Sequence, residues 1–407
     1  MGNGCCSLSS KFSPHECPLP SRYKTLKFLG LGSSAVVFKC LDSWTKTNVA
    51  IKIPRGSRKL NHEAYMMKFL MEHHLDQQNI IRFHLEHCVN SYLVFEMCDI
   101  CLKEYMKQRK TPMSLQDIRA VIQQLATAFD ALKKVGVIHT DVKTNNIMLM
   151  DQKTKPLQVK LIDFGLAIFT HQAMFTRIDQ FLFFKAPELL LGLPYSEALD
   201  IWCLGCVMAS MVFKCTLFPA ANQYEILQYM VDLLGPPPDH LIEAGSKSTQ
   251  YFKRTDCNTW VLKTPKEYCG EKQYLRDKRT YTFRCLDEMR MIQLEPDNPT
   301  EAEERRECIE LLKAMLTWDE KNRITPSEIL AHAFITMKHC DADEESHGAT
   351  SSKLEDRAPP PEAAPAVTVE DQNVVNKDDS RPKKKKKKKE KRLKPIFCWG
   401  RRTTNGQ

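Results

Sequence analysis

The spacing of apolar residues changes part-way along this 407-residue chain, and this change restricts the fold more than any other feature. Between residues 23 and 97, short apolar runs with strand character surround one helical stretch near Lys59–Leu70. The predicted strands are Tyr23–Leu29, Val36–Leu41, Asn48–Ile53 and Tyr92–Glu96. From residue 98 to residue 339 the spacing is mainly helical, with long amphipathic stretches at Leu115–Val135, Tyr224–Leu234 and Glu303–Leu316. We therefore predict an α+β fold with a small sheet-rich part followed by a larger helical part.

The two ends of the chain differ in composition from this folded part. Residues 1–20 are rich in Cys, Ser and Pro and are predicted to form a flexible leader. Residues 341–407 begin with acids and prolines and continue into a lysine run, with too few large apolar side chains to offset the entropy cost of ordering. Residues 381–402 hold 13 Lys and Arg against one acid, which leaves 46 basic and 49 acidic residues elsewhere. Because the positive charge is confined to the predicted disordered tail, we expect no direct nucleic-acid binding.

The sixteen cysteines are scattered among apolar stretches, without the paired spacing of a metal site. The first residues lack the apolar core of a signal peptide, so reduced thiols in an intracellular protein are the expectation. No apolar run reaches the roughly 18 residues that span a bilayer.

Two glycines and a lysine in the sheet-rich part are suited to binding a polyphosphate. Gly30 and Gly32 lie between two predicted strands, where glycine lets the backbone approach phosphate oxygens closely. A glycine turn in an ordinary hairpin would look the same. Lys52 follows in Val49-Ala-Ile-Lys52, and Glu63 on the predicted helix is a carboxylate that could hold it. Alternatively, a lysine of this kind extends from a strand into solvent.

The most specific segment is His139-Thr-Asp141-Val-Lys143-Thr-Asn-Asn146, followed by Asp163-Phe-Gly165. Transfer of a phosphoryl group needs a carboxylate to orient the hydroxyl nucleophile, metal ligands, and cations that neutralise developing charge. Asp141 is the predicted base and Lys143 the predicted contact to the γ-phosphate. Asn146 and Asp163 are the predicted ligands of Mg²⁺, which prefers oxygen donors.

With these motifs, the chain resembles the eukaryotic protein kinase family over residues 23–335. Ala186-Pro-Glu188 and Asp200-Ile-Trp-Cys-Leu-Gly205 follow in the family's order, and Arg323 matches the arginine that pairs with that glutamate. Within the family the chain is most similar to the homeodomain-interacting protein kinases, relatives of the dual-specificity tyrosine-regulated kinases. Four strings carry this likeness: Asn79-Ile-Ile-Arg-Phe, Leu93-Val-Phe-Glu-Met97, Leu191-Gly-Leu-Pro194 and Leu262-Lys-Thr-Pro265.

The resemblance implies a bilobal protein kinase fold in residues 23–339, with an N-lobe at 23–97, a C-lobe at 98–339 and an insert at about 236–300. It implies ATP and Mg²⁺ as cofactors and protein serine or threonine residues as substrates, with transcription regulators among the partners. The implied ATP-binding residues are Leu29, Gly30, Gly32, Val37, Ala50, Lys52, Glu63, Glu96 and Met97. Glu188 and Arg323 are the implied structural pair.

The departures from the family pattern bear on the segment between Gly165 and Glu188. Similar kinases carry a phosphorylated tyrosine at the position of Ile178, and at that of Leu182 an arginine that contacts the phosphate and shapes the pocket after the acceptor residue. We expect instead that the aromatic cluster Phe175, Phe181, Phe183 and Phe184 holds the segment. Phe181 replaces a hydroxyl residue that orients the catalytic groups, and Ala35 replaces a third glycine. These two changes favour the alternative of a kinase-fold scaffold with little turnover.

The chain ends suggest two locations. Met1-Gly2-Asn-Gly-Cys5-Cys6-Ser7 resembles an N-myristoylation site, and Cys5 and Cys6 are candidates for palmitoylation. With the polybasic tail, these groups would attach the chain to an anionic membrane surface. The alternative is that the lysine run is a nuclear localisation signal, and the family resemblance implies a nuclear kinase.

Overall fold

The computed structural model describes residues 19–32, 34–55, 60–84, 92–270, 277–281, 283–291 and 301–337. These residues belong to one unit that extends to His339. The predicted acylation residues Gly2, Cys5 and Cys6 and the predicted tail 341–407 lie outside the described residues, as do residues 271–276, 282 and 292–300 of the predicted insert.

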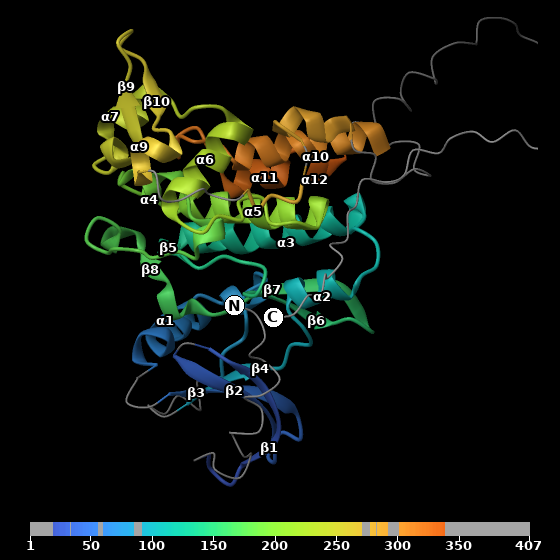
Figure 1. Cartoon of the computed structure of the whole chain (residues 1–407). Helices are drawn as coiled ribbons and strands as arrows, with labels where there is room; N and C mark the ends of the chain where they lie inside the picture. The colour runs from blue at the N-terminus through green and yellow to red at the C-terminus, as the bar shows by residue number, and fades with distance from the viewer. Residues whose placement is uncertain are drawn as a thin grey trace, which may run out of the picture. The chain divides into compact units, whose positions relative to one another are not determined.

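The sheet-rich part is an antiparallel sheet with the order β1-β2-β3-β4 (Figure 1). Its strands are β1 (Tyr23–Leu31), β2 (Ala35–Asp42), β3 (Asn48–Pro54) and β4 (Leu93–Glu96). Alternate residues of β2 are buried on one face, where Val36, Phe38 and Cys40 pack against Val49 and Ile51 of β3. The opposite face of β2 presents Val37, which pairs with Lys52 of β3. Such alternation is typical of a strand with one face against the core.

Helix α1 (Asn61–Glu72) packs against the 3-10 turn Phe164–Leu166. Its buried side chains are Glu63, Met66, Met67 and Leu70, which share one face because they are three, four and seven residues apart. Figure 1 shows α1 beside β3. The helix therefore carries Glu63 on the face that is turned toward the protein interior.

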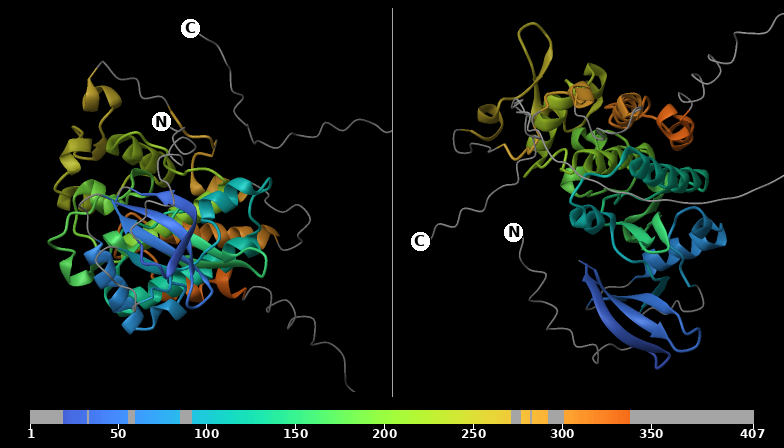
Figure 2. Two further views of the ribbon diagram at one scale, coloured as in Figure 1. Left: turned by 90° about the horizontal axis from the view of Figure 1, so that it is seen from below. Right: turned by 90° about the vertical axis from the view of Figure 1, so that its right-hand side faces the viewer.

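The helical part is built around α3 (Leu115–Lys134) and α5 (Ala198–Phe213), which pack against each other. Ser114 begins α3 by accepting a hydrogen bond from the main-chain N–H of Asp117. Helix α5 is buried on nearly all sides, because α3 and α10 (Glu301–Met315) both contact it (Figure 2). The remaining helices are α2 (Leu102–Gln108), α4 (Pro187–Leu191), α6 (Gln223–Leu234), α7 (Asp239–Ala244), α8 (Ser248–Tyr251), α9 (Pro265–Cys269), α11 (Pro326–Ala331) and α12 (Ala333–Thr336).

Two short antiparallel pairs carry the loops that hold the predicted catalytic residues. The first joins β5 (Val137–Ile138) to β8 (Ile168–Phe169), and the second joins β6 (Ile147–Asp151) to β7 (Lys155–Leu161). A third pair, β9 (Phe252–Arg254) with β10 (Trp260–Leu262), lies within the predicted insert. These short strands were not predicted, because two to seven residues give too little periodicity to distinguish a strand from a loop.

The predicted α+β fold class is confirmed. The ten cysteines in the described part of the chain are free thiols. Across the same residues, every helix is too short or too polar to cross a lipid bilayer.

Candidate active site

Lys52 of β3 joins two carboxylates that come from different parts of the fold. Its Nζ lies 2.7 Å from Oε1 of Glu63 on α1 and 2.8 Å from Oδ1 of Asp163. Glu63 is only 4% exposed, whereas the Asp163 side chain is 41% exposed. The structure thus brings together three residues that are 11 and 111 positions apart in the sequence.

Burial and mutual attraction together set the charges of these three groups. Burial opposes the charge of Lys52, but attraction to the two carboxylates outweighs burial and raises the pKa of the ammonium group. Burial raises the pKa of Glu63 despite the neighbouring lysine. Burial also acts on Asp163, but Lys52 prevails and lowers the pKa of that carboxyl. Lys52 and Asp163 are therefore charged at neutral pH.

The loop after β5 brings together the other predicted catalytic residues. Lys143 donates to Oδ2 of Asp141 over 2.6 Å. Asn146 donates its side-chain nitrogen to the main-chain oxygen and to Oδ2 of Asp141, each at 2.9 Å. The carboxylate of Asp141 is thus oriented by two side chains from its own loop, which is the arrangement that a positioned base requires.

Asp200, at the start of α5, bonds to the main chain of the loop after β5. The sequence analysis did not assign this role to it. Its two carboxylate oxygens accept hydrogen bonds from the main-chain N–H groups of His139 and Thr140, at 2.7 and 2.9 Å. Thr140 needs this support because its φ of 66° is in the left-handed region, which is costly for a β-branched residue. Burial raises the pKa of Asp200 to about 6.

The predicted ATP-binding residues surround one cavity of about 530 Å³. Each of the nine residues, and Asp163, lines it: Leu29, Gly30, Gly32, Val37, Ala50, Lys52, Glu63, Glu96 and Met97. Oε1 of Glu96 accepts hydrogen bonds from Nζ of Lys160 at 2.5 Å and from the main-chain N–H of Arg82 at 2.6 Å, so two neighbours hold this carboxylate in the cavity wall. Sequence reasoning missed the apolar lining residues Phe95, Ile100, Met148 and Ile162, since the sequence has no signal that separates them from ordinary core residues.

The glycine turn is closed by a hydrogen bond from the main-chain N–H of Gly32 to the carbonyl oxygen of Ala35, at 2.8 Å. Ala35 is the first residue of β2 and is 2% exposed, so its methyl group packs into the protein. The backbone of Ala35 lies outside the positive-φ region where only glycine is unstrained. The missing third glycine therefore does not prevent the turn.

The two predicted magnesium ligands present oxygen atoms of the kind that this ion prefers. Asn146 uses its amide nitrogen for Asp141, which leaves the amide oxygen for a cation. Asp163 gives one oxygen to Lys52 and lines the cavity. This donor set fits Mg²⁺. Within the described ranges, no three His, Cys, Asp or Glu side chains are grouped to hold a metal ion.

The segment between Gly165 and Glu188 is not held as the sequence analysis expected. Phe181 contacts the rings of Phe183 and Phe184, with ring centres 5.1 and 6.3 Å apart. The expectation is wrong for Phe175, which is 86% exposed, and Phe181 is itself 52% exposed. The segment has only one side against the protein, so the side chains on its other side remain in contact with solvent.

Gln180, a residue that the sequence analysis did not single out, connects the segment to the core. Its Nε2 lies 3.2 Å from the carbonyl oxygen of Thr140 and 3.1 Å from Sγ of Cys203. Its Oε1 accepts the main-chain N–H of Ala186 at 3.0 Å. Gln180 is 6% exposed, so these bonds are shielded from water.

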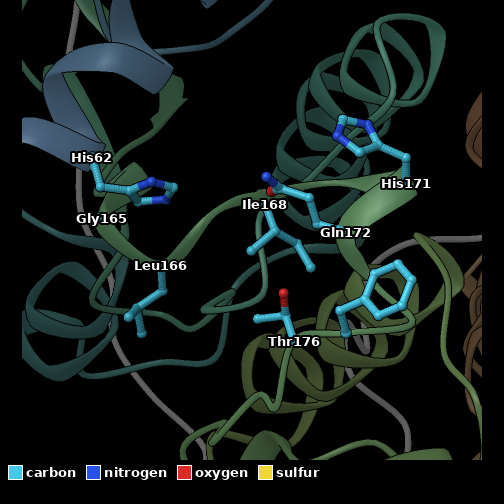
Figure 3. A pocket seen from close by; sticks show the side chains of 8 residues that line it. His62, Gly165, Leu166, Ile168, His171, Gln172 and Thr176 are labelled. Atoms are coloured by element: carbon cyan, nitrogen blue, oxygen red, sulfur yellow. The ribbon is translucent and has the colours of Figure 1, made fainter.

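A second cavity of about 630 Å³ lies between α1 and the segment after Gly165. Figure 3 shows His62 and His171 on opposite sides of it, with Ile168 and Thr176 between them. His62 Nε2 lies 2.7 Å from the carbonyl oxygen of Ala167, so α1 is also tied to the chain that follows Asp163.

Glu188 and Arg323 form the pair that the resemblance implied. Two parallel bonds of 2.9 Å join the guanidinium to the carboxylate, and the two residues are 2% and 3% exposed. Arg323 also donates to the carbonyl oxygens of Thr317 and Ala198, at 3.1 and 2.8 Å. This pair anchors α4 and the end of the segment before it to the helical core.

A sheet-rich part and a helical part, a cavity lined by the Lys52–Glu63 pair and Asp163, and a loop in which Asn146 bonds to Asp141 together form the arrangement of a protein kinase. Residues 23–335 match the protein kinase domain, and the chain belongs to the protein kinase family.

Its curated relatives include the homeodomain-interacting protein kinases, so the predicted resemblance is confirmed. The chain is 40% identical over 346 residues to homeodomain-interacting protein kinase 1 of Mus musculus, covering 80% of this chain and 28% of the relative. It is 40% identical over 343 residues to homeodomain-interacting protein kinase 2 of Mesocricetus auratus, covering 80% and 29%. For homeodomain-interacting protein kinase 4 of Homo sapiens the identity is 34% over 350 residues, covering 80% and 57%. The chain thus matches under a third of the first two relatives' length.

Proposed function

We propose that this chain is an active protein serine/threonine kinase that uses ATP and Mg²⁺. The observation that carries the proposal is the position of Lys52, which bonds to Glu63 and Asp163 at once. Phosphoryl transfer needs this cation beside the phosphates and needs Asp163 beside the metal. A scaffold that had lost catalysis would not need all three groups in hydrogen-bond contact.

In the proposed reaction Asp141 takes the proton of a serine or threonine hydroxyl. The hydroxyl oxygen bonds to the γ-phosphorus as the bond from phosphorus to the departing ADP oxygen breaks in line. Lys143 keeps the carboxylate of Asp141 oriented and carries positive charge toward the γ-phosphate. Mg²⁺, when held by Asn146 and Asp163, would neutralise charge on the phosphate oxygens.

The alternative of a scaffold with little turnover rests on Phe181, which has no hydroxyl to orient Asp141. An assay with radiolabelled ATP and generic basic protein substrates separates the two functions. We expect transfer by the wild type and none above background by Lys52→Ala or Asp163→Ala, with all three proteins folded by circular dichroism. If the wild type and Asp163→Ala transferred equal amounts of labelled phosphate to the substrate, the kinase proposal would be rejected. Phosphoamino-acid analysis should show phosphoserine or phosphothreonine, and no phosphotyrosine from residues 163–188, which contain no tyrosine.

Substrates and location are proposed from the relatives. Their names refer to homeodomain proteins, and we propose transcription regulators as substrates and the nucleus or cytoplasm as the location. Membrane attachment through Gly2, Cys5 and Cys6 is the alternative location. Imaging a C-terminally tagged chain beside Gly2→Ala distinguishes them: a nuclear signal unchanged by the substitution supports the first, and a membrane rim lost in Gly2→Ala supports the second.

A further inference from the structure

A third cavity, of about 560 Å³, lies beside the catalytic loop and has no role in the functions described above. The segment before Ala186 forms one wall, and α6, α8 and α9 form the others. Its lining residues include Asp179, Leu182, Lys185, Gln223, Gln250 and Tyr268. We name it the α6 pocket.

The α6 pocket is close to the place where a substrate hydroxyl would react. Gln180 also lines the pocket, and its side chain bonds to the carbonyl oxygen of Thr140, the residue before Asp141. A peptide whose serine reaches Asp141 would therefore place a neighbouring side chain at this pocket.

Lys185 gives the pocket an unusual electrostatic character. It is 6% exposed, yet its ion-pair partner Asp179 is 98% exposed and lies 3.2 Å away. A buried ammonium group needs strong compensation for lost hydration, and a carboxylate that is surrounded by water provides little. The positive charge of Lys185 is thus incompletely neutralised, and an anion that enters the pocket would be attracted to it.

The opposite wall carries hydrogen-bond donors. Gln223 accepts the hydroxyl of Tyr251 on its Oε1 over 3.0 Å, so its amide N–H groups are the part of the side chain that remains as donors. Gln250 contributes a second amide to the lining. Amide donors and a lysine are the groups that bind carboxylate and phosphate oxygens.

We propose that the α6 pocket is a substrate subsite for an anionic side chain, a carboxylate or a phosphate, close to the acceptor serine or threonine. Lys185 is the residue that sets this specificity. The inference rests on the proposed kinase activity and names a class of substrate for it: acidic or already phosphorylated protein segments. Asp179 lines the pocket with an exposed side chain and would be the group that the substrate anion displaces from Lys185.

Steady-state kinetics on matched peptides tests the proposal in the full chain. Each peptide has one serine, with alanine, glutamate, phosphoserine or lysine at one of the three positions on either side. At one position we expect kcat/KM for glutamate or phosphoserine to exceed that for alanine by about tenfold, mainly through KM. Comparing the two anions shows whether a carboxylate is enough or a phosphate is required.

Three variants assign the effect to this pocket. In Lys185→Met the kcat/KM for the anionic peptide, divided by the kcat/KM for the alanine peptide, should fall to within about twofold of one. In Lys185→Arg, which keeps the charge, the ratio should stay high, and in Asp179→Asn it should rise because the competing carboxylate is gone. Lys247→Met, an exposed lysine outside the pocket, is the matched control and should keep the wild-type ratio.

The outcomes separate the two proposals. If the kcat/KM ratio of anionic to alanine peptide were near one at every position in the wild type, the subsite would be overturned and the kinase proposal would stand.

If no peptide were phosphorylated, the result would count against the kinase proposal, and a binding measurement would then test the subsite. For this arm a fluorescent peptide with alanine in place of serine is titrated by anisotropy. Tighter binding of the phosphoserine peptide, lost in Lys185→Met and kept in Lys185→Arg, supports the subsite. Equal binding of phosphoserine and alanine peptides overturns it.

Discussion

The side-chain amide of Gln180 lies 3.2 Å from the carbonyl oxygen of Thr140, which ties the segment before Ala186 to the loop that carries Asp141. The contact is between two uncharged groups and needs no phosphate. It accounts for how a segment without a tyrosine is positioned. Ile178, where similar kinases carry the phosphorylated residue, packs instead against the core.

Replacing Gln180 with leucine should therefore weaken both the fold and the catalytic loop. The change leaves the buried N–H of Ala186 and the carbonyl of Thr140 without their partner, at about 1–3 kcal/mol each. Chemical denaturation should show a loss of about 2–6 kcal/mol in the free energy of unfolding. In steady-state kinetics, kcat should fall by a larger factor than KM changes. Gln116→Leu, on the exposed start of α3, is the control. Wild-type kcat in a Gln180→Leu protein would show that this contact does not position Asp141.

Phe181→Ser should change catalysis more than stability. Because Phe181 is half exposed, its removal opens no enclosed cavity, and we expect the free energy of unfolding to fall by less than about 1 kcal/mol. A serine hydroxyl could restore a hydrogen bond to the catalytic groups, which would raise kcat by about tenfold. Phe181→Ala removes the ring without adding the hydroxyl and is the control. Equal kcat in the serine and alanine variants would mean that the missing hydroxyl does not limit the rate.

Asp200 should produce a pH dependence of stability with a defined sign. Its pKa in the folded protein is about 6, above the ordinary value of 3.8, so between these values the folded protein holds a proton that the unfolded chain has released. The stability that this group contributes is full below the lower value and is lost as pH rises through the higher one. Asp200→Asn cannot titrate. The amount by which Asp200→Asn is less stable than the wild type, measured as the free energy of unfolding, should therefore be smaller at pH 7 than at pH 5 by about 1 kcal/mol.

Thermal or chemical unfolding of both proteins across this pH range measures the effect. Asp256→Asn, at an exposed position of the insert, controls for the general effect of removing a carboxylate. A difference between wild type and Asp200→Asn that stays constant or grows with pH would contradict the raised pKa.

Sequence reasoning succeeded where a residue's role depends on its neighbours along the chain. The prediction placed Glu63 on a helix as the partner of Lys52, and the structure has Glu63 on the buried face of α1 with Met66, Met67 and Leu70, which are three, four and seven residues further on. It failed where the role depends on a contact between distant segments. Gln180 meets residues 23 and 40 positions away, and a glutamine in a polar loop gives no sign of burial. The α6 pocket was missed for the same reason, since its walls come from residues between 179 and 268.

The pair of Glu188 and Arg323 provides the strongest test of how the end of the segment is anchored. Arg323→Met alone leaves the carboxylate of Glu188 buried without its partner, and such losses cost about 3–5 kcal/mol. The double variant Glu188→Met/Arg323→Met removes both charges and should recover part of this loss. Recovery should be incomplete, because Arg323 also serves the carbonyl oxygens of Thr317 and Ala198, which would lose a donor. A double-mutant cycle by chemical denaturation measures the coupling, which we expect to be about 2–3 kcal/mol. Additive effects of the two single substitutions would show that the guanidinium acts mainly through the carbonyl groups and not through Glu188.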